Sequence, residues 1–117
     1  MLFIQYPKCS TCKKARAWLL EHNLDFEDRH IAEDNPTAEE IDDWRKRSDL
    51  PLKRFFNTSG LLYKSLHLKD RLPTMAEDEQ LRLLASDGML VKRPILVDGN
   101  TVLVGFKPAE WEAAILK

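Results

Sequence analysis

Long hydrophobic runs, low-complexity tracts and a dense set of cysteines are all missing from this sequence of 117 residues. A helix that crosses a membrane needs about 20 consecutive apolar residues, and no segment approaches that length, so we expect no membrane attachment. Only two cysteines occur, and a pair this close together cannot staple a whole fold. The apolar N-terminus lacks the pattern of a secretory signal, so we expect a cytoplasmic protein.

Clusters that mix basic and aromatic residues are also missing, which argues against direct binding of nucleic acid. The formal net charge is −1, but residues 1–17 carry four bases and no acid, residues 21–43 ten acids and one base, and residues 45–71 eight bases and two acids. These blocks indicate either solvated helix faces or a positive field near the N-terminal loop. Such a field suits a thiolate, an anionic small molecule or an acidic partner.

The first third of the chain has the pattern of a strand, a helix and a second strand. The apolar run Leu2–Tyr6 indicates a buried strand, and apolar residues at helical spacing from Ser10 predict a helix that ends near Asn23. A second strand is expected at 25–31. A β–α–β unit of this length implies two parallel strands.

Helix signals dominate the middle of the chain. Thr37 with Glu40, and Thr74 with Glu77, match the capping-box spacing that opens helices, and one or two further helical turns are expected at 61–68. We therefore predict an all-helical insertion at about 37–88, inside a single domain that covers residues 1–117.

Strand signals return near the C-terminus. Apolar runs at 95–97 and 102–104 flank an Asp-Gly-Asn-Thr turn, which predicts a β-hairpin. Pro108 suits the first position of a final helix. The order βαβ, helices, ββα predicts an α/β fold in which a four-stranded mixed sheet carries helices on its faces.

The Cys9-Ser10-Thr11-Cys12 motif lies where the first strand meets the first helix. A helix start stabilises a negative sulfur, and Lys8 and other nearby lysines add positive charge. We expect a lowered pKa for Cys9, attack by its thiolate on a disulfide or oxidised partner, and resolution by Cys12. Half of a zinc site and a pair of inert core cysteines are the alternatives. A second cysteine pair and compact histidine spacing are both missing, so we predict no metal site.

The segment Lys92-Arg93-Pro94-Ile95 is the second candidate. A proline just before a strand is either an edge residue without an N–H for the ladder or a cis proline that packs beside the cysteine loop. In the second case Arg93 lies near Cys9, where a guanidinium stabilises a thiolate or holds an oxyanion. In the first case Arg93 is a surface arginine.

These motifs resemble those of the arsenate reductase/Spx/YffB family of thioredoxin-fold proteins, and the resemblance covers nearly the whole chain. It rests on the segments Tyr6–Ala15, Lys53–Gly60 followed by Tyr63, Lys92–Val97, and Val104–Pro108. The resemblance implies a thioredoxin-like fold with the family's helical insertion, a nucleophile at Cys9, a thiolate-supporting Arg93 and a cis Pro94.

Glutaredoxin-linked arsenate reductases of this family use one nucleophilic cysteine and a cluster of arginines. Arg93 matches one of those arginines, whereas Asn57 and Lys107 stand where two others are expected. The resemblance thus implies a thiol–disulfide oxidoreductase with weak or no arsenate reduction. We expect no bound cofactor, and we expect glutathione, glutaredoxin or thioredoxin as the electron donor. Beside the catalytic Cys9, Cys12 and Arg93, the expected substrate-binding residues are Lys8, Ser10, Thr11, Asn57, Pro94 and Lys107.

Spx-type members of the family use the same Cys-x-x-Cys pair as a redox switch and bind the C-terminal domain of the RNA polymerase alpha subunit. A redox-sensing regulator of this type is therefore the alternative to an enzyme. The basic residues between 45 and 71 are the sequence feature that motivates it.

Overall fold

The computed structural model of the protein describes residues 1–116. Its strands are β1 (Leu2–Gln5), β2 (Glu27–His30), β3 (Ile95–Asp98) and β4 (Thr101–Val104). Its α-helices are α1 (Ser10–Glu21), α2 (Ala38–Ser48), α3 (Leu61–Ser65), α4 (Leu68–Arg71), α5 (Glu77–Ser86) and α6 (Pro108–Ile115). Within the described residues there are also three 3₁₀ turns: η1 (Leu52–Phe55), η2 (Leu72–Thr74) and η3 (Gly88–Leu90). No described helix is both long and apolar enough to cross a membrane.

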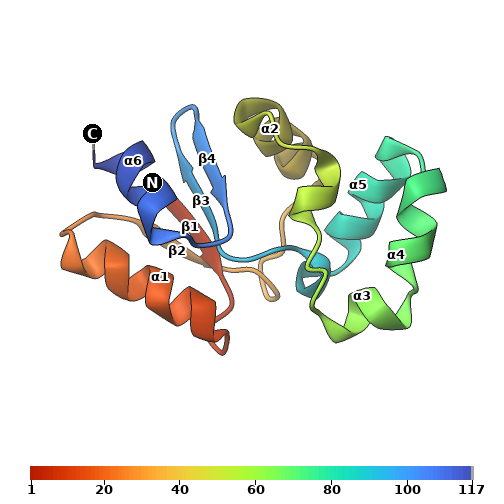
Figure 1. The fold of residues 1–117 in the computed structure, drawn as a ribbon, viewed down its shortest axis with the longest axis horizontal. Coiled ribbons are helices and arrows are strands. Elements are labelled where there is room, and N and C mark those ends of the chain that lie inside the picture. Colours follow the sequence, from red (N-terminus) through yellow and green to blue (C-terminus); the bar gives the residue numbers. More distant parts are fainter. Residues whose placement is uncertain (117) are drawn as a thin grey trace.

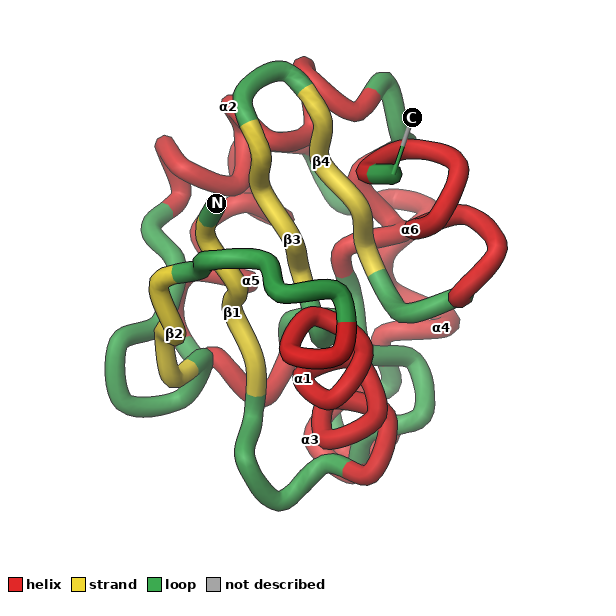
Figure 2. Tube along the Cα trace, turned by 90° about the vertical axis from the view of Figure 1, so that its left-hand side faces the viewer, coloured by secondary structure: helices red, strands yellow, loops and turns green. Residues whose placement is uncertain are grey.

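The four strands form one mixed sheet in the order β2-β1-β3-β4. β1 pairs in parallel with β2 and antiparallel with β3, and β3 and β4 form a hairpin whose turn contains Gly99 at φ 59°. Figure 2 shows the strands in this order, with β1 and β3 in the centre. The predicted α/β fold with a βαβ unit and a C-terminal ββα unit is therefore confirmed.

Helices cover both faces of the sheet. Helices α1 and α6 lie on one side, and the helices between β2 and β3 lie on the other (Figures 1 and 2). Neighbouring residues of β1 point to opposite faces of the sheet. Phe3 belongs to the hydrophobic cluster that contains Trp18 and Trp111, whereas Ile4 belongs to a second cluster, which contains Trp44. This second cluster runs continuously from the sheet into the insertion, so the sheet and the insertion share one core.

Helix α2 begins with the capping box that the sequence predicts. Glu40 N donates to Thr37 Oγ1 at 3.1 Å, and Thr37 N donates to Glu40 Oε1 at 3.0 Å. Arg29 also donates to both carboxylate oxygens of Glu40, at 2.7 and 2.9 Å. These hydrogen bonds from Arg29, against opposing burial and with help from Thr37, lower the pKa of Glu40 to about 2. These hydrogen bonds connect strand β2 to the first turn of helix α2.

The second predicted capping box, at Thr74 and Glu77, is wrong. Helix α5 begins at Glu77 with Ala76 as its N-cap. The Thr74 hydroxyl instead donates to the Arg71 carbonyl at 3.2 Å, and Met75 has extended backbone angles. The chain between Thr74 and Glu77 is therefore not a helical turn, and the side chain of Glu77 cannot close back on Thr74.

One antiparallel bridge, between Phe56 and Val91, adds to the helices of the insertion. Asn57 N donates to Leu90 O at 2.7 Å, and Lys92 N donates to Phe55 O at 2.8 Å. Two loops far apart in the sequence therefore lie side by side next to the cysteine motif.

Candidate active site

The cysteine motif occupies the junction between β1 and α1, as predicted. Cys9 is the N-cap residue of α1, with φ −84° and ψ 125°. Its backbone N–H donates to Tyr6 O at 3.0 Å, and its carbonyl accepts from Lys13 N at 3.0 Å. Both cysteines are free thiols, Cys9 half-buried and Cys12 fully buried. The Cys9 sulfur is therefore accessible to a substrate, whereas the Cys12 sulfur is covered by the protein.

Cys9 has the electrostatic surroundings of a nucleophile. Burial raises the pKa of its thiol, but hydrogen-bonding groups of Cys12, Arg93 and Thr11 together outweigh burial and leave the pKa below its ordinary value. The Cys9 side chain makes no capping hydrogen bond to the N–H groups at the start of α1. The N–H groups at the helix start therefore act by their proximity, and they bind more strongly once the sulfur is charged.

Cys12 has the opposite character. Burial raises the pKa of its thiol to about 12, with a further contribution from its neighbour Cys9. At neutral pH Cys12 is therefore protonated while Cys9 is the acidic partner. The two sulfurs are one helical turn apart, which brings their side chains to the same face of α1.

Arg93 is held beside Cys9 by two features. The Arg93–Pro94 peptide bond is cis, and the Pro94 carbonyl accepts from Gly105 N at 2.8 Å. The Arg93 guanidinium stacks on Tyr6, with 5.1 Å from its Cζ to the ring centroid, a cation–π distance. The rings of Tyr6 and His30 also pack edge to face, with 5.6 Å between their centroids.

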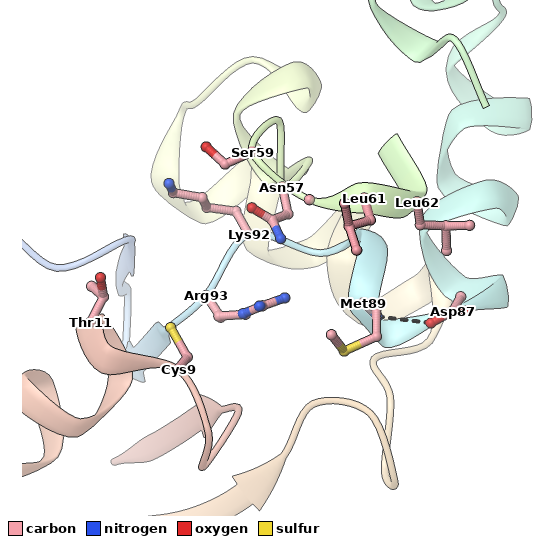
Figure 3. Close-up of a pocket in the computed structure, with 11 residues that line it drawn as sticks. Cys9, Thr11, Asn57, Ser59, Leu61, Leu62, Asp87, Met89, Lys92 and Arg93 are labelled. Carbon is pink, nitrogen blue, oxygen red and sulfur yellow. Dashed lines mark hydrogen bonds between the residues drawn. The ribbon is translucent and has the colours of Figure 1, made fainter. Parts of the chain in front are cut away.

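A cavity of about 640 Å³ opens next to the Cys9 sulfur. Figure 3 shows Cys9 on one side, the guanidinium of Arg93 reaching into the middle, and side chains of the insertion opposite. The nitrogen Nη1 of Arg93 is buried and has no hydrogen-bond partner within residues 1–116. The cavity is lined by Cys9, Thr11, Asn57, Ser59, Gly60, Leu61, Leu62, Asp87, Met89, Lys92 and Arg93.

The structure brings some of the predicted site residues together and leaves others outside. Cys9, Thr11, Asn57 and Arg93 line the cavity, and Cys12 lies buried behind Cys9 in α1. Pro94 is buried and fixes the adjacent backbone without lining the cavity. Lys8 and Ser10 are exposed and outside it. Lys107 lines a different cavity and lies 3.6 Å from Glu110.

Several residues that line the cavity were not predicted from the sequence. Leu61, Leu62 and Met89 have the apolar character of core residues, so their positions in the sequence give no functional signal. Lys92 belongs to the motif that flags Arg93, and it could have been found there. Ser59, Gly60 and Asp87 come to the cavity through the pairing of Phe56 with Val91, which cannot be seen in the sequence.

Two observations bear on the alternative interpretations of the cysteine pair. No group of three or more His, Cys, Asp or Glu side chains suited to a metal ion occurs within residues 1–116. An inert core pair is also disfavoured, because Cys9 lines an open cavity beside a guanidinium.

Comparison with known proteins gives the family of the chain. The model of the ArsC family matches residues 4–114. The chain belongs to the ArsC family. Among curated relatives, the protein YusI of Bacillus subtilis (strain 168) is 54% identical over 96% of this chain and 95% of its own. The regulatory protein MgsR of the same organism is 32% identical over 94% of this chain and 86% of its own.

Solved structures also resemble this ArsC-family chain. An ArsC family related protein from Bacteroides fragilis superposes with a TM-score of 0.93 at 58% identity, covering 96% of this chain and 94% of the other. The resemblance inferred from the motifs is thereby confirmed at the level of family and fold.

The Tyr6 ring gives a first prediction for this ArsC-family site. Replacing Tyr6 with leucine removes the surface on which Arg93 stacks, so we expect the pKa of Cys9 to rise toward that of a free thiol. The rate of Cys9 alkylation by iodoacetamide at pH 7 should fall about two- to fivefold. The alkylation rate as a function of pH should shift to higher pH, with mass spectrometry used to confirm that the label is on Cys9.

The matched control is Tyr6→Phe, which keeps the ring and loses only the hydroxyl. We expect this variant to react like wild type. If Tyr6→Leu and Tyr6→Phe slow alkylation equally, the stacking on Arg93 has no part in activating Cys9.

Proposed function

We propose that the protein is a thiol–disulfide oxidoreductase with Cys9 as nucleophile and Cys12 as resolving thiol. The observation that carries this proposal is the asymmetry of the pair: Cys9 is accessible with a lowered pKa, and Cys12 is buried and protonated. Such an asymmetry supports attack by one sulfur and delayed reaction of the other.

The exchange proceeds in two steps. The Cys9 thiolate attacks one sulfur of a substrate disulfide, forms a mixed disulfide and expels the other half as a thiolate, which takes a proton from solvent. Cys12 then loses its proton and attacks the Cys9 sulfur, forming the Cys9–Cys12 disulfide and releasing the second substrate half as a thiol. Two electrons pass from the protein to the substrate, and a donor dithiol or two monothiols must return them.

The mixed disulfide itself favours the second step. The charge on Cys9, which helps to raise the pKa of Cys12, disappears when Cys9 becomes bonded to the substrate. One of the causes that keep Cys12 protonated is then gone, although burial remains. Glutathione, glutaredoxin and thioredoxin are the proposed donors for the return of electrons.

We infer that arsenate is a weak substrate or none. A tetrahedral oxyanion is bound well by several arginines, because each guanidinium offers two parallel N–H donors. Arg93 is the only arginine that lines the cavity among the described residues, Asn57 supplies an amide, and Lys107 lies elsewhere. The cavity thus has fewer bidentate donors than an arginine cluster would supply.

A turnover assay tests the proposal. Wild-type protein is given 2-hydroxyethyl disulfide or arsenate, with glutathione alone, glutathione plus glutaredoxin, or thioredoxin with its reductase. We expect disulfide reduction with at least one donor and little arsenate reduction with any. Absence of catalysed disulfide reduction with all three donors would contradict the enzyme assignment, and fast arsenate reduction would contradict the substrate preference.

A second candidate function is redox-sensing regulation. It is favoured by relatives such as MgsR, whose name describes a regulatory protein, and by bases of the insertion such as Lys53, Lys64 and Lys69, which form no ion pair within residues 1–116. The partner proposed for this role is the C-terminal domain of the RNA polymerase alpha subunit. Pull-down with that domain, on reduced and oxidised protein, separates the two functions, since no binding in either state counts against a regulator.

A further inference from the structure

Three apolar side chains, together with the carboxylate of Asp87, form the cavity wall opposite Cys9, although this wall faces solvent. Leu61 is 86% exposed, the most exposed of the large apolar side chains described. Leu62 and Met89 beside it are half-buried and line the same cavity. Figure 3 shows Leu61 and Met89 on the same side of the cavity, beyond the end of the Arg93 side chain. An apolar surface held in this position next to a nucleophile is a mark of a recognition site.

The turn that carries Leu61 is fixed by hydrogen bonds. Gly60 N donates to Asn57 O at 3.1 Å, and Asn57 N donates to Leu90 O at 2.7 Å. A Cβ at Gly60 would lie 2.8 Å from Asn57 Nδ2, so the turn closes tightly around the asparagine. Leu61 is therefore presented by an anchored loop, which keeps the cost of ordering low when a ligand binds.

The Arg93 guanidinium supplies a polar group at the same place. Its Nη1 is buried without a partner in the described chain, and Figure 3 shows the guanidinium end pointing away from Cys9, toward Leu61 and Met89. A buried N–H without an acceptor is costly, and a ligand oxygen placed there would remove that cost. A ligand that spans from Cys9 to this wall needs an acceptor oxygen and an apolar group beyond its sulfur.

A cysteine-containing peptide has this arrangement of groups. Its backbone carbonyls are acceptors close to the sulfur, and a neighbouring side chain provides the apolar group. An inorganic oxyanion offers acceptors but nothing to contact Leu61, and it would fill little of a cavity of about 640 Å³.

We propose that Leu61, Leu62 and Met89 form a subsite for an apolar side chain next to the disulfide cysteine of a peptide substrate, while Arg93 Nη1 donates to a carbonyl of that peptide. This proposal rests on the thiol–disulfide exchange proposed above and names its substrate class. Leu61 is then a specificity-determining residue that has no part in the chemistry at sulfur.

The test uses two short blocked peptides, one with leucine and one with serine on both sides of a single cysteine. Each peptide is joined to 5-thio-2-nitrobenzoate by a disulfide. Attack of Cys9 on the peptide sulfur breaks that bond and releases the coloured thionitrobenzoate anion, so single-turnover rates need no added reductant. For wild type we expect the second-order rate constant of thionitrobenzoate release to be about tenfold higher for the leucine peptide, mainly through tighter binding.

The variant Leu61→Ser should lose most of this preference, seen as the ratio of the rate constants for the two peptides. The small 2-hydroxyethyl disulfide, which does not reach the wall, serves as a third substrate that reports exchange at Cys9 in wild type. The matched control is Leu20→Ser, because Leu20 is also exposed, at 52%, but lies on α1 outside the cavity. Both leucines are exposed, so neither substitution threatens the fold.

The outcomes are distinct. Equal rates for the two peptides in wild type, a preference that survives Leu61→Ser, or a preference lost equally in Leu20→Ser would overturn the subsite and leave the exchange function standing. Failure of wild type to react with any of the three disulfides would overturn the proposed function and the subsite together.

Discussion

Replacing Cys9 with serine is expected to abolish disulfide exchange, with a loss of about 10³-fold or more. A serine hydroxyl stays protonated at neutral pH and cannot form the mixed disulfide. The neighbouring Cys12 cannot take over, since it is fully buried and the pKa of its thiol is raised to about 12. Release of thionitrobenzoate from a peptide disulfide measures the loss.

The partner variant Cys12→Ser separates the two steps of the reaction. The first step should survive, because the accessible sulfur and Arg93 remain, so the mixed disulfide accumulates and appears by intact mass spectrometry as one peptide added to the protein. Turnover with a dithiol donor should fall, while a monothiol that attacks the mixed disulfide directly can restore it. If Cys9→Ser retains exchange, or if Cys12→Ser forms no adduct, the roles assigned to the two cysteines are wrong.

Replacing Gly88 with alanine is expected to be the most destabilising small substitution outside the site. A Cβ at this position would lie 1.8 Å from Ile31 O and 2.7 Å from Ile31 C. These are backbone atoms just after β2, and Ile31 N already donates to Gln5 O at 2.9 Å, so they cannot move aside without disturbing the sheet. We expect a loss of about 3 kcal/mol or more in the free energy of unfolding, measured by chemical denaturation.

Gly99→Ala is the matched control for this prediction. Gly99 has a left-handed φ of 59°, and nothing lies within 4 Å of an added Cβ. Only the conformational cost of alanine in that region applies, about 1 kcal/mol. Equal losses in the two variants would show that close packing against Ile31 is not what requires glycine at position 88.

Much of the fold could be predicted because its signals are local. The periodicity switch after Cys9, the Thr37–Glu40 capping box and the hairpin turn at Gly99 depend on residues within a few positions of one another, and each is found in the structure. The Thr74–Glu77 pattern satisfied the same local rule and failed, because Thr74 bonds to the Arg71 carbonyl instead. A local sequence pattern shows which hydrogen bonds are possible between nearby residues, but it cannot show whether a side chain bonds to another group instead.

The site was predictable only in part, for the same reason. Cys9 and Arg93 carry chemical signals of their own, and Asn57 was flagged by the family resemblance. The apolar wall at Leu61 and Met89 exists because the loops at 57–62 and 87–92 are joined by the Phe56–Val91 bridge. Lys107 shows the converse, since a position matched in sequence is directed to another surface by the fold.

The Phe56–Val91 bridge separates reactivity from selectivity within one cavity. The strand–helix junction and the segment at Arg93 hold the proposed nucleophile, whereas the two bridged loops, which both lie between β2 and β3, form the opposite wall of the cavity. Substitutions in the wall at Leu61 and Met89 are therefore expected to change the preferred substrate without changing the pKa of the Cys9 thiol. Under the proposed function, the peptide that is attacked and the thiol chemistry can then change independently in evolution.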